Sequence, residues 1–465
     1  MTVAPVFRLV AHAGGVAYNF VVADREQRFL LPPDLRDWLP QDHLAWFVID
    51  VVGQLDLSRF RASYRSDGHG RAAYDPAMMV GLLLYAYCLG VRSSRAIERR
   101  CVEDIAFRVL AGNHCPDHVT IARFRQRHEL ALADVLVDSL RLCATAGLVE
   151  LGTVMLDGTK IEANATKSAS RTLADIEAEV AGMLADADAA DSAEDERERR
   201  DRDGGVPPAL ADPRSRLARL KEAKARLEAD AAERAERFAE RSRLLNEARA
   251  VKGLPARTFR PRPRDEAPKP DAKANVTDPD SRFLRRQGGT CQGYNAQIVC
   301  TADQVIVAAE ITQAINDVEQ LEPMLHAVAA TTNAAGIGDT PAALVADAGY
   351  WRAENVDGSI ADAPELFIPV AKHARRGKPR KSGLPSGSKT DHLVVAMNER
   401  MGTPRGKEMA VLRRVTVEPT FGQIKDARNA RRFMRRGLDA CASEWKLICG
   451  THNLLKLWRH QHASA

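Results

Sequence analysis

Aromatic residues make up only 5% of this 465-residue chain, and no apolar run is long enough to cross a bilayer. The shortage of aromatics, in a chain rich in Ala, Arg and Leu, favours helix. The missing long apolar run excludes a membrane-spanning segment. Residues 9–23 lack charge but contain His12, two glycines and Asn19, so they make a poor signal peptide. We therefore expect a cytoplasmic protein with no membrane partner.

Cysteine is present without the spacing that binds zinc. The eight cysteines are scattered along the chain and form no Cys-x-x-Cys pair, so we do not expect zinc ligation. His114, Cys115 and His118 lie close together in sequence, but we expect no metal there. Buried, reduced thiols in a cytosolic protein are the natural interpretation.

Charge of one sign is not in large excess overall, but it is unevenly placed. The chain has 67 Lys and Arg against 62 Asp and Glu, a formal net charge of +5. Acidic residues gather around 175–198, and basic residues gather around 254–269, 372–381 and 425–436. A locally basic surface of this kind indicates a nucleic-acid partner.

The first part of the chain reads as an extension followed by a helical domain. We expect residues 1–28 to be an N-terminal extension and 29–150 to be all helical, with Asp75-Pro76 starting an apolar helix. The last helix, VTIARFRQRHE, is basic and carries Arg123 and Arg125. The pattern fits a helix-turn-helix-like DNA reader, and it also fits a plain helical bundle with solvent-facing arginines.

A low-complexity segment interrupts the chain after residue 169. Residues 170–252 are rich in Ala, Glu, Asp and Arg, with apolar positions at coiled-coil spacing, and a Gly/Pro break at 204–208 divides them. They predict an antiparallel helical hairpin. Residues 253–280 are basic and proline-rich, which predicts an extended linker.

Short apolar runs on both sides of this insertion predict strands. They are 154–156, 294–300, 305–311, 343–346 and 366–370. Two of them end in a carboxylate followed closely by glycine, at Asp157 and at Asp347. A carboxylate on a buried strand is costly unless it is paired or bound to a metal. The alternative is an aspartate that merely begins a turn.

A strongly basic stretch lies near the end of the chain. Residues 413–436 read as one amphipathic helix, with Pro419 in its first turn and Glu418 at its head. The spacing Arg414-x3-Glu418-x6-Lys425 puts these three side chains on about the same side of a helix. The alternative is a surface helix with a solvated charged face. The following tail reads as a packing helix in which His452 is structural.

These motifs together resemble a family. Arg414, Glu418 and Lys425 match the Arg-x3-Glu-x6-Lys signature of bacterial insertion-sequence transposases of the DDE type, although Val411 stands where that signature has Tyr. The likeness is strengthened by the two aspartate motifs and by the segments VEPTFGQIK and GTHNLLKL. It extends from about residue 29 to 458. The resemblance implies a mixed α/β, ribonuclease-H-like catalytic domain formed by residues 151–169 and 281–465, with the helical insertion between them.

The resemblance also implies a chemistry. Asp157, Asp347 and Glu418 would be both the catalytic residues and the ligands of two Mg²⁺ ions, or of Mn²⁺ in their place. The protein would bind double-stranded DNA at transposon ends, cleave it and join the 3′ ends to target DNA, as a dimer in the DNA complex and on the nucleoid. The implied DNA-binding residues are Arg414, Lys425, Arg428, Arg431, Arg432, Arg435, Arg436, Arg123 and Arg125. Two alternatives remain, a metal-dependent nuclease without joining activity and an inactive DNA-binding remnant.

Overall fold

The structure is a computed structural model that describes residues 35–64, 73–197, 216–259, 268–286, 288–370 and 391–463, with two short paired strands at Val10–Ala11 and Ala17–Tyr18. The rest of the predicted extension 1–28, the break at 204–208 and the basic loop 372–389 lie outside the described residues. Among the described helices, none is long and apolar enough to cross a membrane.

The N-terminal region is helical, as predicted. Polar caps begin several of its helices: Asp75 caps α3, Asp104 caps α5 and Asp117 caps α6, each accepting a backbone N–H with its carboxylate. Helix α3 is apolar all round and is buried on nearly every side. The main helices are α1 (Leu44–Gln54), α3 (Pro76–Cys88), α4 (Ser94–Glu103), α5 (Ile105–Leu110), α6 (His118–Arg127), α7 (Glu129–Ala133) and α8 (Val135–Thr145).

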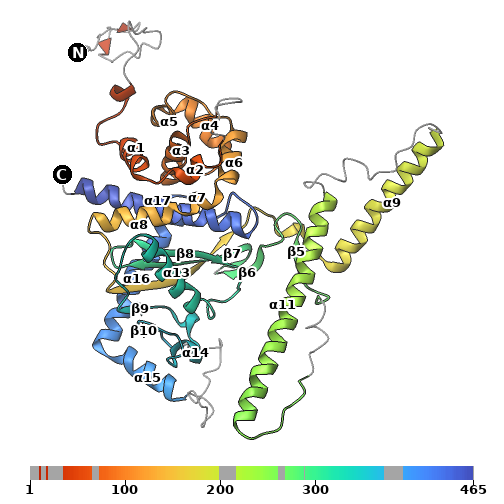
Figure 1. The fold of residues 1–465 in the computed structure, drawn as a ribbon. Coiled ribbons are helices and arrows are strands. Elements are labelled where there is room, and N and C mark those ends of the chain that lie inside the picture. Colours follow the sequence, from red (N-terminus) through yellow and green to blue (C-terminus); the bar gives the residue numbers. More distant parts are fainter. Residues whose placement is uncertain are drawn as a thin grey trace.

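The centre of the molecule is a mixed sheet (Figure 1). Its strands are β3 (Thr153–Glu162), β6 (Arg282–Arg286), β7 (Gly289–Thr301), β8 (Ile306–Thr312), β9 (Ala343–Val345) and β10 (Glu365–Phe367). The order is β8-β7-β3-β9-β10, with β6 beside the start of β7. Strand β7 is antiparallel to both of its neighbours, β3 and β8, and β9 and β10 run parallel to β3. This order is consistent with the predicted ribonuclease-H-like fold.

Helices cover both faces of the sheet because side chains alternate along β3. Met155 and Ile161 pack into a core that includes Trp445 of α17 (Leu438–Ala463) and Val417 of α16 (Pro404–Gly422). On the other face, Leu156 packs with residues of α13 (Leu321–Ala334). The first core continues into α1, α3 and α5, so the N-terminal helices and the sheet share one apolar interior. Figure 1 shows α17 and α8 lying between them.

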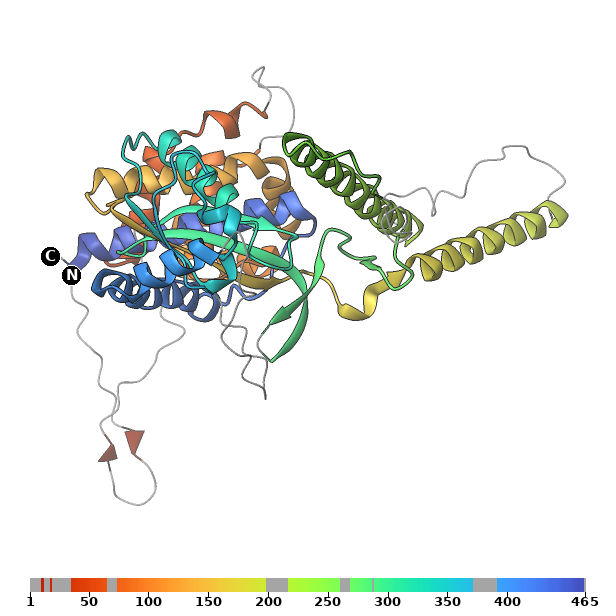
Figure 2. The same cartoon turned by 90° about the horizontal axis from the view of Figure 1, so that it is seen from below.

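The insertion projects from the edge of the sheet (Figure 2). Strands β4 (Ser170–Thr172) and β5 (Lys273–Asn275) pair at its base, and α9 (Leu173–Arg197) and α11 (Arg216–Val251) form its arms. A small core of its own holds the arms together near the base, where Ile176 meets Leu220 and Leu227. The insertion therefore needs separate contacts to fix it to the sheet.

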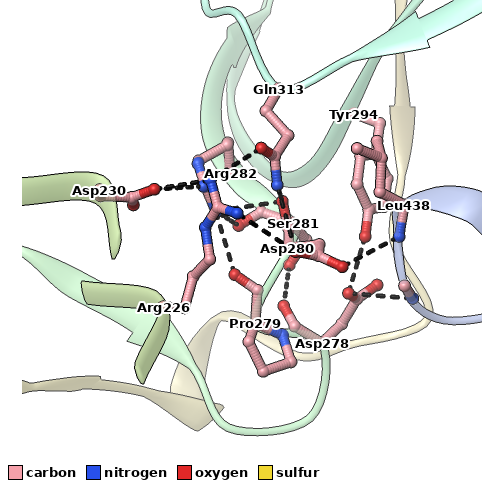
Figure 3. Close-up of polar contacts among 11 residues, drawn as sticks. Arg226, Asp230, Asp278, Pro279, Asp280, Ser281, Arg282, Tyr294, Gln313 and Leu438 are labelled. Carbon is pink, nitrogen blue, oxygen red and sulfur yellow. Dashed lines mark hydrogen bonds and ion pairs between the residues drawn. The ribbon is translucent and has the colours of Figure 1, made fainter. Parts of the chain in front are cut away.

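A polar cluster supplies these contacts (Figure 3). Arg226 of α11 donates a hydrogen bond of 2.9 Å to Gln313, and its guanidinium lies 3.7 Å from the carboxylate of Asp280. Arg282 of β6 reaches back to Asp230 of α11 at 3.0 Å. The base of the insertion is thus bound to the β6 edge and to the end of β8.

The same cluster holds the beginning of α17. Asp280 accepts the backbone N–H of Leu438 at 3.1 Å, and Asp278 accepts that of Gly437 at 3.2 Å. The hydroxyl of Tyr294 on β7 donates to Asp278 at 2.7 Å. Carboxylates at a helix N-terminus satisfy its free N–H groups, so these two aspartates fix where α17 starts.

Two predictions about local structure were wrong. The single helix expected over 413–436 is divided: α16 begins at Pro404 behind its Thr403 cap and ends at Gly422, a π-helical turn follows at Gln423–Ala427, and the chain is irregular up to 437. Pro419 therefore lies inside a helix rather than in a first turn, because Thr403-Pro404 supplies the better start.

The second wrong prediction concerns the burial of the cysteines. Cys115 is exposed, whereas the other seven cysteines are buried, and all eight are free.

Candidate active site

The sheet brings Asp157 and Asp347 together. Strands β3 and β9 are parallel, with Met155 opposite Val345, so the two aspartates follow side by side on the same face and at the same edge. Asp157 accepts the N–H of Gly158 at 2.8 Å. Asp347 caps the turn Ala348–Tyr350 and accepts the N–H of Gly349 at 2.7 Å. Two carboxylates far apart in sequence thus share one place.

Arg413 of α16 lies between the two carboxylates. Its Nη2 is 2.7 Å from Oδ2 of Asp157 and 3.9 Å from Oδ2 of Asp347. The side chains of Arg413 and Asp157 are each 17% exposed, and that of Asp347 is 45% exposed. Sequence reasoning chose the next residue, Arg414, which is exposed. Arg413 could have been found as the cation on the helix stripe that includes buried Met409 and Val417.

The electrostatics of this place disfavour a lone negative charge. Burial raises the pKa of Asp157 from an ordinary value near 3.8 to about 6, although the Arg413 guanidinium opposes the rise. The neighbouring carboxylates of Asp347 and Asp317 add to it. Asp317 was not among the residues selected from the sequence. It accepts a hydrogen bond from Asn295 at 2.7 Å.

Glu418 lies on the helix that crosses this site. It comes five residues after Arg413 and seven before Lys425, whose Nζ donates to Thr159 of β3 at 2.9 Å. Glu418 is therefore bracketed along the chain by two side chains that both reach β3. Its own side chain is exposed, and it makes no hydrogen bond or ion pair with the described part of the chain. Burial lowers the pKa of Lys425.

The structure thus brings two of the three predicted carboxylates into contact with one cation. Within the described ranges, no group of three or more His, Cys, Asp or Glu side chains is arranged to hold a metal ion. The donors that are together, Asp157 and Asp347, are hard carboxylate oxygens, which suit a divalent cation such as Mg²⁺. The position of the Arg413 guanidinium shows that this place attracts positive charge, so the residues present fit such a cation.

The predicted DNA-binding residues divide by exposure. Arg125 and Arg428 are buried. Arg125 donates to the hydroxyl of Tyr87 at 3.2 Å and to the carbonyl of Arg92 at 2.8 Å, whereas Arg428 donates to Thr451 at 3.0 Å. Burial lowers the pKa of Arg428 to about 10. Since both guanidinium groups are buried inside the protein, we do not include them in a DNA surface.

The other basic residues lie nearer to solvent. Arg435 is half-buried and forms an ion pair of 3.1 Å with Glu129. Arg432 pairs with Glu162 at 3.3 Å, and the Nε of Arg436 donates to the carbonyl of Asn164 at 3.0 Å. These contacts lay the basic segment along the end of β3. The exposed members of the set are Arg123, Arg414, Arg431, Arg432 and Arg436.

A mixed sheet that holds Asp157 within β3, beside Asp347 at the carboxyl end of the adjacent parallel strand β9, is a setting for metal-dependent chemistry on phosphodiesters. Residues 33–127 match a transposase domain known as DUF772, and residues 271–454 match the transposase DDE domain. No curated protein and no solved structure matches the chain. The chain belongs to the insertion-sequence transposases with a DDE domain, a family of enzymes that cleave and transfer DNA.

The DDE match covers only part of the site. It includes Asp347 and Glu418 but begins after the insertion, so Asp157 lies outside it. The pairing of β3 with β7 and β9 joins Asp157 to the matched region in three dimensions. DDE transposases generally use divalent metal ions, and membership of the family implies transposition and DNA binding.

Proposed function

We propose that this transposase binds the ends of its insertion sequence, cleaves the DNA there and joins the freed 3′ ends to target DNA. In the first step water attacks the phosphodiester, and the P–O bond to the 3′ oxygen breaks to leave a 3′-hydroxyl. In the second step that hydroxyl attacks a target phosphodiester and displaces another 3′-hydroxyl. The observation that best supports the proposal is the pairing of Asp157 with Asp347 beneath the helix that carries Glu418.

The proposal assigns catalysis to three acidic residues, Asp157, Asp347 and Glu418. The same three residues would hold two Mg²⁺ ions, or Mn²⁺ in their place. When bound, the ions lower the pKa of the attacking oxygen and stabilise the charge on the leaving oxygen. The protein supplies the rest of the setting. Burial in the middle of the sheet limits water around Asp157, and Arg413 balances its charge while the protein is free of metal.

Arginine and lysine side chains grip the DNA in this proposal. Lys425 and Arg414 contact phosphates close to the cleaved end, since both flank Glu418 on α16 and the turn that follows it. Arg431, Arg432 and Arg436 add salt-dependent affinity that does not read sequence. Arg123 on α6 is placed to contribute from the N-terminal region. Cutting two ends in one complex calls for a dimer on DNA, and we expect it to act in the cytoplasm on nucleoid DNA.

The test is incubation with DNA that flanks the gene of this protein, with Mg²⁺ and with EDTA, comparing wild type with Glu418→Gln. We expect wild type to cut at the ends only with Mg²⁺ and Glu418→Gln to bind without cutting. A second substrate, a precut end with a target plasmid, measures joining. Cutting without joining would favour a nuclease. End binding with no Mg²⁺-dependent cutting, unchanged by Asp157→Ala, would favour an inactive remnant.

A further inference from the structure

A third aspartate lies beside the predicted pair and has no role in the proposal so far. Asp317 follows β8, and its side chain is 25% exposed. The next helix, α13, begins only at Leu321, and its cap position is Gln320. Asp317 therefore does not cap α13, and its position must be explained by other contacts.

Three donors from the sheet fix one oxygen of Asp317. Its Oδ1 accepts from Asn295 at 2.7 Å and from Gln297 at 2.8 Å, and the Nζ of Lys160 lies 3.2 Å away. Asn295 and Gln297 are completely buried on β7. The hydroxyl of Tyr350 donates to the amide oxygen of Gln297, which turns the NH₂ group of Gln297 toward Asp317. Tyr350 belongs to the turn that Asp347 caps, so the network ties Asp317 to Asp347.

The glycine that follows Asp157 makes room for Asp317, and the glycine that follows Asp347 lies in ordinary contact distance of it. A Cβ at Gly158 would lie 2.3 Å from Nε2 of Gln297 and 2.8 Å from Oδ1 of Asp317. A Cβ at Gly349 would lie 2.9 Å from Oδ1 of Asp347 and 3.8 Å from Oδ2 of Asp317. Oδ1 of Asp317 is therefore against β3, and Oδ2 is on the side of Asp347. The two Asp-Gly motifs read in the sequence meet around this third carboxylate.

Placing a third negative charge there costs energy without a cation. Like charges at close range disfavour ionisation, and burial strengthens the effect. Only Arg413 and Lys160 are paired with the three aspartates within the described structure. Three carboxylates against two cations leave a net negative charge even before the exposed Glu418 is counted. A divalent cation is the partner that such a site favours.

We propose that Asp317 is a positioning residue of the active site: held by Asn295, Gln297 and Lys160, its carboxylate adds negative charge beside Asp157 and Asp347 and raises their affinity for divalent cations. The inference rests on the proposed function, since it assumes that Asp157 and Asp347 bind the cation. It goes beyond the proposed function by giving a role to a fourth acid and to Gly158, which leaves room for that acid.

The test measures Mn²⁺ binding to the full-length, DNA-free protein by the paramagnetic resonance signal of free Mn²⁺. We expect Asp317→Asn to weaken binding about 10- to 100-fold, the usual range for residues that support metal ligands. Glu319→Gln is the matched control, because it removes a nearby charge from an exposed side chain outside the network, and it should leave affinity unchanged. Thermal unfolding of each variant confirms that it is folded.

Lys160→Met gives a test of opposite sign. It removes the cation that partly neutralises Asp317, so we expect tighter Mn²⁺ binding, which a merely structural role would not produce. Two results would overturn the inference about Asp317 but leave the proposed function standing. They are a folded Asp317→Asn variant that binds Mn²⁺ as tightly as wild type, and weaker Mn²⁺ binding by Lys160→Met. Wild type that binds no Mn²⁺, or that binds it as well after Asp157→Asn, would overturn the metal site of the proposed function as well.

Discussion

The Asp157→Asn substitution should make the metal-free protein less sensitive to rising pH. Asp157 is the buried member of the pair, and it faces Asp347, Asp317 and Arg413. Its raised pKa means that the folded state holds a proton more tightly than the unfolded chain does. Stability from this group is therefore present at low pH and is lost as pH rises through about 6.

The size of the effect follows from the two pKa values. The gap between 3.8 and about 6 corresponds to about 3 kcal/mol of unfolding free energy over the whole titration. Between pH 5 and pH 8, where most of that titration of the folded state occurs, the loss is about 1 kcal/mol. Asparagine carries no charge at either pH, so the variant lacks this loss.

The assay is urea unfolding at pH 5 and pH 8 in EDTA, for wild type, Asp157→Asn and the control Glu319→Gln. Other titrating groups are common to all three proteins, so they cancel in the differences. We expect the unfolding free energy of wild type, relative to Asp157→Asn, to fall by about 1 kcal/mol from pH 5 to pH 8. Glu319→Gln should follow wild type. Excess Mg²⁺ at pH 8 should raise the unfolding free energy of wild type but not that of Asp157→Asn.

A difference between wild type and Asp157→Asn that is constant from pH 5 to pH 8 would refute this reasoning. It would mean that Asp157 is as well solvated in the folded protein as in the unfolded chain. A difference that grows in favour of wild type as pH rises would show that Arg413 outweighs burial, and the sign of the argument would be wrong.

Three further outcomes test the packing and the DNA surface. Arg125→Ala should lower the unfolding free energy by about 2–4 kcal/mol in urea titrations, because it leaves buried partners unpaired, whereas Arg123→Ala on the same helix should leave it unchanged. Glu444→Ala should cost about 3–5 kcal/mol, since it strands the buried guanidinium of Arg92, 3.0 Å away; a loss below about 1 kcal/mol would contradict the burial of the pair. Lys425→Ala should weaken binding to end DNA and reduce the slope of log affinity against log salt by about 1, and an unchanged slope would remove Lys425 from the phosphate contacts.

Much of the catalytic framework was readable from the sequence because its signals are local. Short apolar runs before Asp157 and Asp347 predict strands, and β3 and β9 lie at both places. Contrary to expectation, the first strand does not end at Asp157 but continues to Glu162. The family likeness is confirmed by the domain matches. The start of α3 at Asp75-Pro76 was equally local, since a cap and a first-turn proline act on their own helix.

Two features required the tertiary structure. Whether Arg413 or Arg414 faces the aspartates depends on the rotation of α16 against the sheet, which the sequence pattern from 413 onward did not define. Whether an arginine is buried depends on partners elsewhere in the chain: Arg125 is held by Tyr87, on a helix that no local pattern connects to it. Basic residues look alike in sequence until their partners are known.

The sequence by itself determined the strands, the two Asp-Gly motifs and the membership of the transposases, because apolar runs, turns and signatures are short-range patterns. Only the tertiary structure decided that Asp317 lies with Asp157 and Asp347, that Arg413 is paired with the latter two, and that Glu418 is exposed. The physical reason is that strand pairing and helix packing bring together charges from distant parts of the chain. Their energies depend on burial and on neighbouring charges, which no single stretch of sequence contains.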